Sequence, residues 1–205
     1  MIYGEAATGK TTTVIQAATN AAKMGFKVLY LDSDHSFTQQ RFHQIAKETS
    51  SETSELIMLF LPETFAEQRT IIQSLENYVT PLLGLVIVDS ISSLYRAAFS
   101  SADSIFSLNR DLSGQLANLG ELCTRSGLAC IITSQVHAKL TPPSSDVEPV
   151  ARRAVLHFPR MILRLRNTPR ANVKEFSVER IEGSDLRAAS SLVALKEGGL
   201  EDVQA

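Results

Sequence analysis

The fold of this chain is decided by the stretch Gly4-Glu5-Ala6-Ala7-Thr8-Gly9-Lys10-Thr11, which lies close to its N-terminus. The stretch matches the phosphate-binding loop pattern G-x-x-x-x-G-K-[ST] at every fixed position. Its two glycines let the backbone curl, so that successive N–H groups point at phosphate oxygens. Lys10 would bring a positive charge to the β- and γ-phosphates, and the Thr11 hydroxyl is a hard oxygen ligand for Mg²⁺. The stretch therefore predicts a nucleoside triphosphate site with a magnesium ion.

The residues on either side of the loop have the character that the motif requires. The apolar residues 1–3 read as the end of a strand, and the Ala-rich residues 11–24 read as a helix that Gly25 ends. The positive end of that helix would face the phosphates. A strand usually has about 5–6 residues, and so few precede the loop that we expect the natural protein to begin further upstream.

Length and composition favour one α/β domain over residues 1–205, with a net charge of −2. That near balance gives no global attraction to a polyanion. The two cysteines, Cys123 and Cys130, have no metal-ligand spacing, so we expect buried apolar residues in a reducing cytoplasm. The sequence shows no signal peptide and no apolar run long enough to cross a bilayer, so we expect a cytoplasmic protein without a membrane partner.

Apolar runs predict further strands at residues 27–32, 56–61, 85–89 and 128–134, and continuous runs of this kind suit a parallel sheet that is covered on both faces. Helical spacing of apolar residues predicts helices at 38–47, 64–78 and 108–126. The polar segments 48–54, 91–107 and 138–149 read as loops. Residues 161–166, 175–181 and 191–196 alternate with the strand period, which predicts an antiparallel extension at the edge of the sheet.

Two polar residues stand at the ends of predicted strands. Asp89 follows an apolar run, and a carboxylate there is the usual partner of a phosphate-binding loop, where it holds Mg²⁺, generally through water. The alternative is that Asp89 only caps a helix. Gln135 follows the next strand, where its amide could sense the γ-phosphate.

Every charged residue from Arg152 to Lys174 is basic. Guanidinium groups beside a flexible loop could grip a nucleic-acid backbone. A solvated sheet face, or pairing with acids of a neighbouring subunit, explains the same pattern. The stretch therefore leaves DNA contact open.

Together these segments resemble a known family. The resemblance rests on the loop with its flanks, on Asp32-Ser33-Asp34 followed by Phe37 and Arg41, and on the segments at 85–90, 134–137, 148–151 and 199–202. In order and spacing the chain resembles the RecA-like recombinases, and most closely the archaeal RadB proteins, which are small paralogues of the RadA recombinase. The resemblance covers essentially the whole chain. It implies a RecA-like P-loop NTPase fold, ATP with Mg²⁺, and DNA repair by homologous recombination.

The resemblance also implies roles for particular residues. ATP would be held by Gly4, Glu5, Ala6, Ala7, Thr8, Gly9, Lys10, Thr11 and Thr12, with Arg41 packed on the adenine and Thr11 and Asp89 on the metal. Lys10, Asp34 and Gln135 would serve hydrolysis, with Gln135 coupling the γ-phosphate to the loop that follows it. Segments 96–107 and 137–153 would be the two DNA-binding loops, with contacts from Arg96, His137, Lys139, Arg152 and Arg153.

Two departures from the family pattern matter. The family usually has a glutamate at the position of Asp34, where it orients the attacking water. An aspartate falls roughly 1.5 Å short of that reach, and errors of about 1 Å can cost large factors in rate, so we expect slow hydrolysis. Filament-forming recombinases also carry an N-terminal DNA-binding domain and a linker that docks on the next subunit. Nothing before Ile2 could supply them, which favours a mediator or regulator over a strand-exchange enzyme.

The first interpretation is thus a weakly hydrolysing accessory protein that binds ATP and DNA, with single-stranded DNA favoured, and assists a RadA-type recombinase, as a homo-oligomer or otherwise. The second is an ATP-dependent switch of the signalling or circadian-clock branch of the superfamily, which binds protein instead of DNA. A small-molecule kinase is the third, because residues 138–153 could imitate a lid. The match at Ser134-Gln135 favours the recombinase branch over a kinase.

Overall fold

The computed structural model describes residues 1–99, 104–138, 147–183 and 189–203. Within them nine strands form one sheet in the order β11-β10-β9-β8-β1-β5-β4-β2-β3. Its parallel part contains β1 (Ile2–Gly4), β2 (Lys27–Asp32), β3 (Ile57–Phe60), β4 (Leu83–Asp89), β5 (Ala129–Ser134) and β8 (Met161–Asn167). The antiparallel part adds β9 (Val173–Ile181), β10 (Ser190–Lys196) and β11 (Gly199–Asp202).

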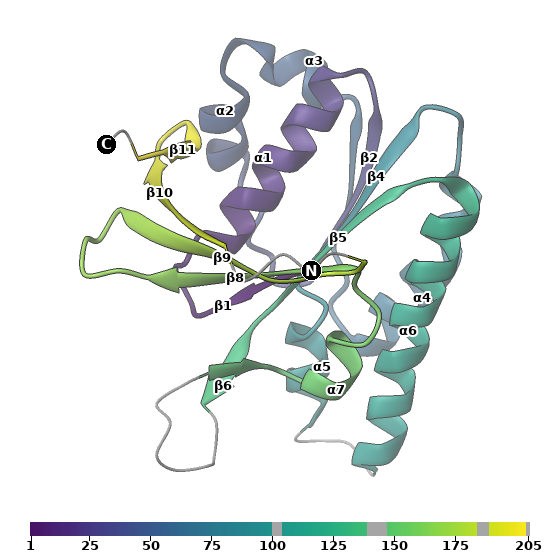
Figure 1. Cartoon of the computed structure of the whole chain (residues 1–205). Helices are drawn as coiled ribbons and strands as arrows, with labels where there is room; N and C mark the ends of the chain where they lie inside the picture. The colour runs from purple at the N-terminus through teal and green to yellow at the C-terminus, as the bar shows by residue number, and fades with distance from the viewer. Residues whose placement is uncertain (100–103, 139–146, 184–188, 204–205) are drawn as a thin grey trace.

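Helices cover both faces of the sheet, as its apolar strands require (Figure 1). On one face lie α1 (Lys10–Lys23) and α2 (Gln39–Ala46), joined to α3 (Ser50–Ser54) by a 3₁₀ turn, η1 (Lys47–Thr49). On the other face lie α4 (Phe65–Ser74) with the 3₁₀ turn η2 (Leu75–Tyr78), α5 (Ser93–Phe99), α6 (Ile105–Ser126) and α7 (Arg152–Val155). No helix within the described ranges is long and apolar enough to cross a membrane.

The two faces have separate apolar cores. Val14 and Ile15 of α1 pack with Phe42 of α2 against one face. On the other face, Leu112 and Leu116 of α6 pack among the buried residues of the larger cluster. Helical spacing of apolar residues placed the helices correctly because these side chains form one stripe on each helix.

The predicted strands and long helices are present, and several local predictions are wrong. Residues 48–54, predicted as a loop, form η1 and α3, and residues 93–99 form α5. The loop predicted at 138–149 begins and ends in a two-stranded ribbon of β6 (Val136–Ala138) and β7 (Val147–Pro149). β8 runs parallel to β1, so the antiparallel extension begins only at β9, and it has a further strand, β11.

The first strand is as short as its sequence indicates, and it lies in the middle of the sheet. β1 pairs with β5 only at Thr133 and Ser134. Beside the earlier part of β5 lies a cavity of about 470 Å³ that Met1, Cys130 and Met161 help to line. Cys123 is buried as expected, whereas Cys130 is exposed.

Candidate nucleotide-binding site

The phosphate-binding loop joins β1 to α1, as its sequence predicts. Gly9, at φ +96°, adopts the left-handed backbone that a side chain would strain. Gly4 is needed for a different reason, because a Cβ there would lie 2.3 Å from the Leu165 carbonyl oxygen of β8. The buried Thr8 hydroxyl donates to the Glu5 carbonyl at 2.9 Å and fixes the curl. The sheet thus holds the loop in a shape that residues with side chains at 4 and 9 could not adopt.

Lys10 is held by the loop itself. Its Nζ atom donates to the carbonyl oxygens of Gly4 at 2.8 Å and Glu5 at 2.7 Å. Burial lowers the pKa of the Lys10 ammonium, while the nearby carboxylates of Asp89 and Asp34 raise it. A triphosphate would bring negative charge to an ammonium that two neutral carbonyls now hold. This donor therefore fits a polyanion.

The residues expected to hold the metal lie together at the ends of β4 and α1. Asp89 is 1% exposed, and its carboxylate accepts hydrogen bonds from the Tyr30 hydroxyl at 3.0 Å and the Thr133 hydroxyl at 2.5 Å. Burial raises the pKa of Asp89, and hydrogen bonds from Thr133, Thr11 and Tyr30 oppose that rise. Sequence analysis missed Tyr30 and Thr133, although the position of Thr133 near the end of a parallel strand was a usable signal.

The donors fit magnesium bound together with phosphates. A hydroxyl and a carboxylate are hard oxygen ligands, and Mg²⁺ usually combines one or two such groups with water and phosphate oxygens. The described residues contain no cluster of three or more His, Cys, Asp or Glu that could hold a metal alone. Asp32 is also buried nearby, but its carboxylate accepts from the backbone N–H groups of Ser36 at 3.1 Å and Phe37 at 2.8 Å. Asp32 therefore shapes the turn that carries Asp34.

The structure brings Asp34, Gln135 and Arg96 together. The Gln135 amide nitrogen donates to both Asp34 carboxylate oxygens, at 3.3 and 3.4 Å. Its amide oxygen accepts from the Arg96 guanidinium at 2.6 Å. The Ser93 hydroxyl, which sequence analysis missed, also donates to Asp34. Arg96 was expected at DNA, and in this structure it contacts Gln135, so its DNA contact stays a prediction.

Arg41 lies between the start of α1 and the C-terminal hairpin. Its guanidinium donates to the carbonyl oxygens of Lys196 at 2.9 Å and Glu197 at 2.7 Å, in the turn between β10 and β11. It also lies 3.5 Å from the hydroxyl of Thr12, the last residue expected at the nucleotide. Packing of Arg41 on adenine stays a prediction, and the contact with the hairpin is new.

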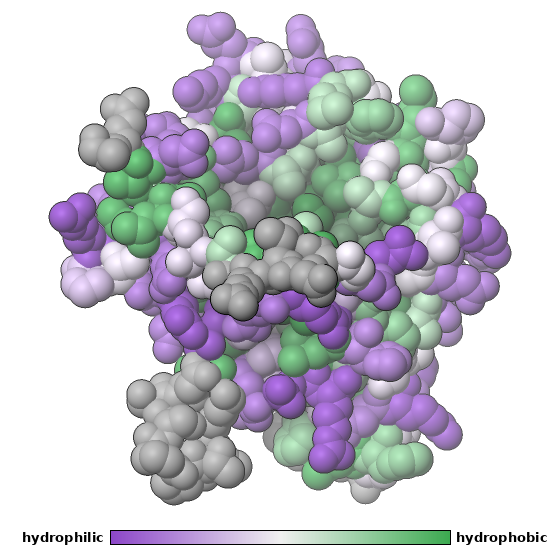
Figure 2. All heavy atoms as spheres, in the orientation of Figure 1, coloured by the Kyte–Doolittle hydropathy of each residue, from purple (hydrophilic) through white to green (hydrophobic). Residues whose placement is uncertain are grey.

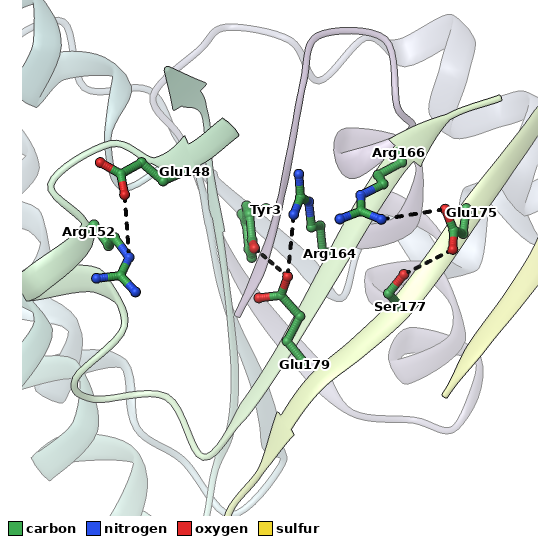
Figure 3. A network of polar contacts seen from close by, with 8 residues as sticks. All are labelled: Tyr3, Glu148, Arg152, Arg164, Arg166, Glu175, Ser177 and Glu179. Carbon is green, nitrogen blue, oxygen red and sulfur yellow. Dashed lines mark hydrogen bonds and ion pairs between the residues drawn. The ribbon is translucent and has the colours of Figure 1, made fainter. Parts of the chain in front are cut away.

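Several arginines of the basic stretch pair with glutamates of the same chain (Figure 3). On β8, Arg164 lies 3.8 Å from Glu179 of β9, and the Tyr3 hydroxyl donates to the same carboxylate at 2.6 Å. Pairing of the same kind, at 4.0 Å, joins Arg166 to Glu175. Antiparallel pairing of β8 and β9 places Arg166 directly opposite Glu175, and Glu179 lies two residues beyond Ser177, the residue opposite Arg164. The acidic partners of these β8 arginines therefore lie on β9 of the same chain. The sequence had left open that such partners belong to a neighbouring subunit.

The residues expected to contact DNA around the second loop lie at its base. His137 and Arg152 approach Glu148 at 3.3 and 3.5 Å. Arg153 lines, with both of them, a cavity of about 580 Å³ between α6 and α7. Lys139 lies outside the described residues. The structure thus gathers three of the four predicted basic residues of this segment around one hollow.

Comparisons with known proteins agree with this geometry. A family model described as Rad51 matches residues 1–203. A DNA repair and recombination protein RadB of Thermococcus gammatolerans is 32% identical over 207 residues, covering 98% of this chain and 88% of the relative. One of Methanococcoides burtonii is 31% identical over 167 residues, covering 82% and 73%.

The fold has the same relatives. The crystal structure of the RadB recombinase aligns with a TM-score of 0.81 at 29% identity, over 99% of this chain and 89% of that one. The fold is therefore RecA-like, a mostly parallel sheet between helices with antiparallel C-terminal strands, as expected from the sequence. With a family model matched along nearly its whole length, this chain belongs to the Rad51 family.

Proposed function

We propose that this protein binds ATP and DNA, hydrolyses ATP slowly, and assists a RadA-type recombinase in homologous recombination and repair. The observation that carries the proposal is the contact of Gln135 with both Asp34 and Arg96. This one amide joins the carboxylate beside the phosphate-binding loop to the strand that leads into residues 139–146. A change at the γ-phosphate would therefore alter the contacts of Gln135 and with them the start of the second loop.

The residues divide the work of hydrolysis between them. The N–H groups of the loop and Lys10 bind the phosphates, and Thr11 and Asp89 would hold a magnesium ion, Asp89 through water. Mg²⁺, when bound, offsets charge on the β- and γ-phosphates. Asp34 accepts a hydrogen bond from the attacking water and orients it, and Gln135 registers the γ-phosphate. Phosphoryl transfer needs mainly positioning and charge stabilisation, so the short reach of Asp34 makes turnover slow.

Support for DNA binding comes from two surfaces. His137, Arg152 and Arg153 surround the hollow at the base of the second loop. Beside residues 100–103, the side chains of Phe99 and Phe106 are 47% and 78% exposed, and apolar atoms are visible near that end of α6 among mostly polar neighbours (Figure 2). Cationic groups that neutralise phosphates and aromatic rings that stack on bases are the usual elements of single-strand binding.

The test is a titration of labelled single-stranded DNA with and without an ATP analogue, at two salt concentrations. We expect affinity to fall steeply with salt, and Arg153→Ala to flatten the logarithmic salt slope by about 0.7 for each phosphate that the variant no longer neutralises. Arg125→Ala is the matched control, because Arg125 lies in the last turn of α6 and pairs with Glu76 of η2. No DNA binding in either nucleotide state, at low salt, would overturn the proposal.

The alternative, an ATP-dependent switch that binds protein, is favoured by one observation. Glu148 lies against both His137 and Arg152, so part of the positive charge expected at DNA is already offset. Glu148→Gln separates the two functions. If DNA is the partner, removing this carboxylate raises DNA affinity, whereas a protein switch gains no salt-dependent DNA binding. A RadA-type partner is tested by adding the protein to strand-exchange reactions of that recombinase, where we expect stimulation.

A further inference from the structure

Three buried polar side chains form a continuous row between the nucleotide-binding site and the middle of α6. The Ser33 hydroxyl donates to the Gln68 Oε1 atom at 2.9 Å, and the Gln68 Nε2 atom donates to the Gln115 Oε1 atom at 2.8 Å. Ser33 follows β2, Gln68 lies on α4 and Gln115 lies on α6. The three residues are 4%, 0% and 1% exposed. None of them entered the site predicted from the sequence.

A row of buried amides is an energetically unfavourable way to fill a core. Burying an amide is unfavourable unless both ends are hydrogen-bonded, and apolar side chains of similar shape would pack at no such cost. The Gln115 Nε2 atom is buried and has no hydrogen-bond partner among the residues that the structure describes. Apolar neighbours such as Ile72 and Leu112 show that this layer is otherwise hydrophobic. Unlike a leucine side chain, an amide makes directional hydrogen bonds, and each of these bonds fixes the position of its partner.

Gln68 fixes the turn that carries Asp34. Ser33 immediately precedes Asp34, and its backbone N–H donates to the Asp89 carbonyl oxygen at 2.8 Å. The same Gln68 amide nitrogen that reaches Gln115 also lies 3.3 Å from the Ile91 carbonyl oxygen, two residues beyond Asp89. One side chain therefore ties the end of β2 to the segment that follows β4. These are the two strand ends that bring the water-orienting and metal-binding carboxylates together.

The turn that carries Asp34 needs a contact of this kind to hold it in place. Asp34 and His35 are exposed, and His35 has φ +50°, a conformation that is unfavourable for a residue with a side chain. Burial cannot hold Asp34, because its carboxylate lies at the surface of the site. Gln135 and Ser93 contact this carboxylate, and the backbone beside it is held from the interior by two buried side chains, those of Asp32 and Ser33.

We propose that Gln68 is a positioning residue for ATP hydrolysis, which acts through Ser33 to hold Asp34 at the γ-phosphate. This inference rests on the proposed function and assigns it a residue that touches neither nucleotide nor metal. Gln115 holds the far end of the Gln68 amide and so fixes its orientation. Because Gln68 does not contact the phosphate-binding loop, its loss should slow the chemical step and leave nucleotide affinity unchanged.

The test separates positioning from packing. Gln68→Leu is compared with the double variant Gln68→Leu/Gln115→Leu, which removes both amides and leaves no new unpaired partner between them. We expect single-turnover hydrolysis to fall about 10- to 100-fold in both, with the Kd for an ATP analogue within about twofold of the parent chain. The melting temperature should fall in the single variant and recover in the double variant. Gln73→Leu, the same change at an exposed position of α4, is the control and should alter neither rate nor affinity.

Ser33→Ala removes the same hydrogen bond by deleting its other partner, the Ser33 hydroxyl. It should slow hydrolysis as much as Gln68→Leu, and combining the two should cost little more, since they break one bond. Hydrolysis that recovers with melting temperature in the double variant would show a purely structural role and overturn the proposal. So would additive effects of Ser33→Ala and Gln68→Leu.

A second readout does not depend on turnover. Amide hydrogen exchange at Ser36 and Phe37, the N–H groups that Asp32 holds, should quicken about tenfold in the double variant without nucleotide. Unchanged exchange there would overturn the inference. If the parent chain hydrolyses no more ATP than Lys10→Ala does, the proposed function fails, and the exchange experiment still decides whether Gln68 holds the turn.

Discussion

At the scale of single residues, Lys10 is the group whose loss should matter most to nucleotide binding. Its ammonium lies in a loop of curled backbone, where only two carbonyl oxygens are seen to accept from it within the described residues. Removing one partner of a buried charge pair costs about 2–5 kcal/mol of binding free energy. We therefore expect Lys10→Ala to lose measurable ATP binding by calorimetry, and Lys23→Ala, in the exposed last turn of the same helix, to retain it. Normal ATP binding by Lys10→Ala would remove the basis of the site.

Asp34 carries the second prediction at this scale. Because one methylene limits its reach, Asp34→Glu should raise hydrolysis, by roughly tenfold if about 1 Å of misplacement is corrected. Asp34→Ala should abolish what turnover there is. Both are measured as phosphate release at saturating ATP, with and without DNA. Robust DNA-stimulated turnover of the parent chain that Asp34→Glu lowers would show that the aspartate already reaches the water.

At the scale of elements, local patterns in the sequence predicted what depends on local chemistry. The loop from Gly4 to Thr11 and the apolar run that ends at Asp89 each contain their own signal, so β1, α1 and β4 were placed correctly. α5 was missed because its residues are flanked by a Ser-rich segment that reads as a loop. The antiparallel pairing of β8 with β9 agrees with the prediction, but the parallel pairing of β8 with β1 was missed. That pairing depends on contacts far apart in the sequence, and alternation along residues 161–167 is the same in either direction.

The hairpin of β10 and β11 is the element whose docking was least predictable, and it makes a prediction. Gln16 of α1 accepts from the Leu200 backbone N–H at 2.8 Å and donates to the Leu200 carbonyl at 3.2 Å. A Cβ on Gly199, at φ +114°, would lie 2.7 Å from the Gln16 side chain. Gly199→Ala should therefore lower the free energy of unfolding by about 2–3 kcal/mol, through strain and loss of this docking.

The control for the hairpin is Gly183→Ala. Gly183 also has positive φ, at +74°, but a Cβ there would meet no atom of the described residues within 4 Å. Strain alone should cost about 1 kcal/mol, so urea unfolding curves of the two variants should differ. Equal losses would mean that the contact with Gln16 contributes nothing.

At the scale of the whole molecule, the sequence predicted the architecture, while the roles of the site residues stay predictions. It did not show how the site is supported. Tyr30, Ser93 and Gln68 were missed for one reason: their side chains gain importance only from partners on other elements. The sequence showed the basic residues of β8, but it did not show that glutamates of β9 pair with them. A single sequence shows which groups are present, and the fold decides which of them meet.

When the 205-residue chain is produced with Met1 as its first residue, its stability should depend on the free amine there. That amine lies in the middle of the sheet and donates to the Met161 carbonyl oxygen at 2.8 Å. Burial is the main reason why its pKa is lowered to about 6, with Arg180 lowering it further and Cys130 raising it. In the unfolded chain the amine has an ordinary pKa of about 8. Between pH 6 and 8 the unfolded state therefore binds more protons than the folded state, so stability rises with pH.

Across that window the gain should approach about 2–3 kcal/mol in the free energy of unfolding. It is measured by urea unfolding at pH 6, 7 and 8. The comparison is with the same chain acetylated at Met1, which keeps every other ionisable group and removes only the amine. We expect the free-amine chain to gain stability relative to the acetylated chain as pH rises. Parallel pH dependences would show that the Met1 amine titrates alike in both states, and hence that the middle of the sheet admits water.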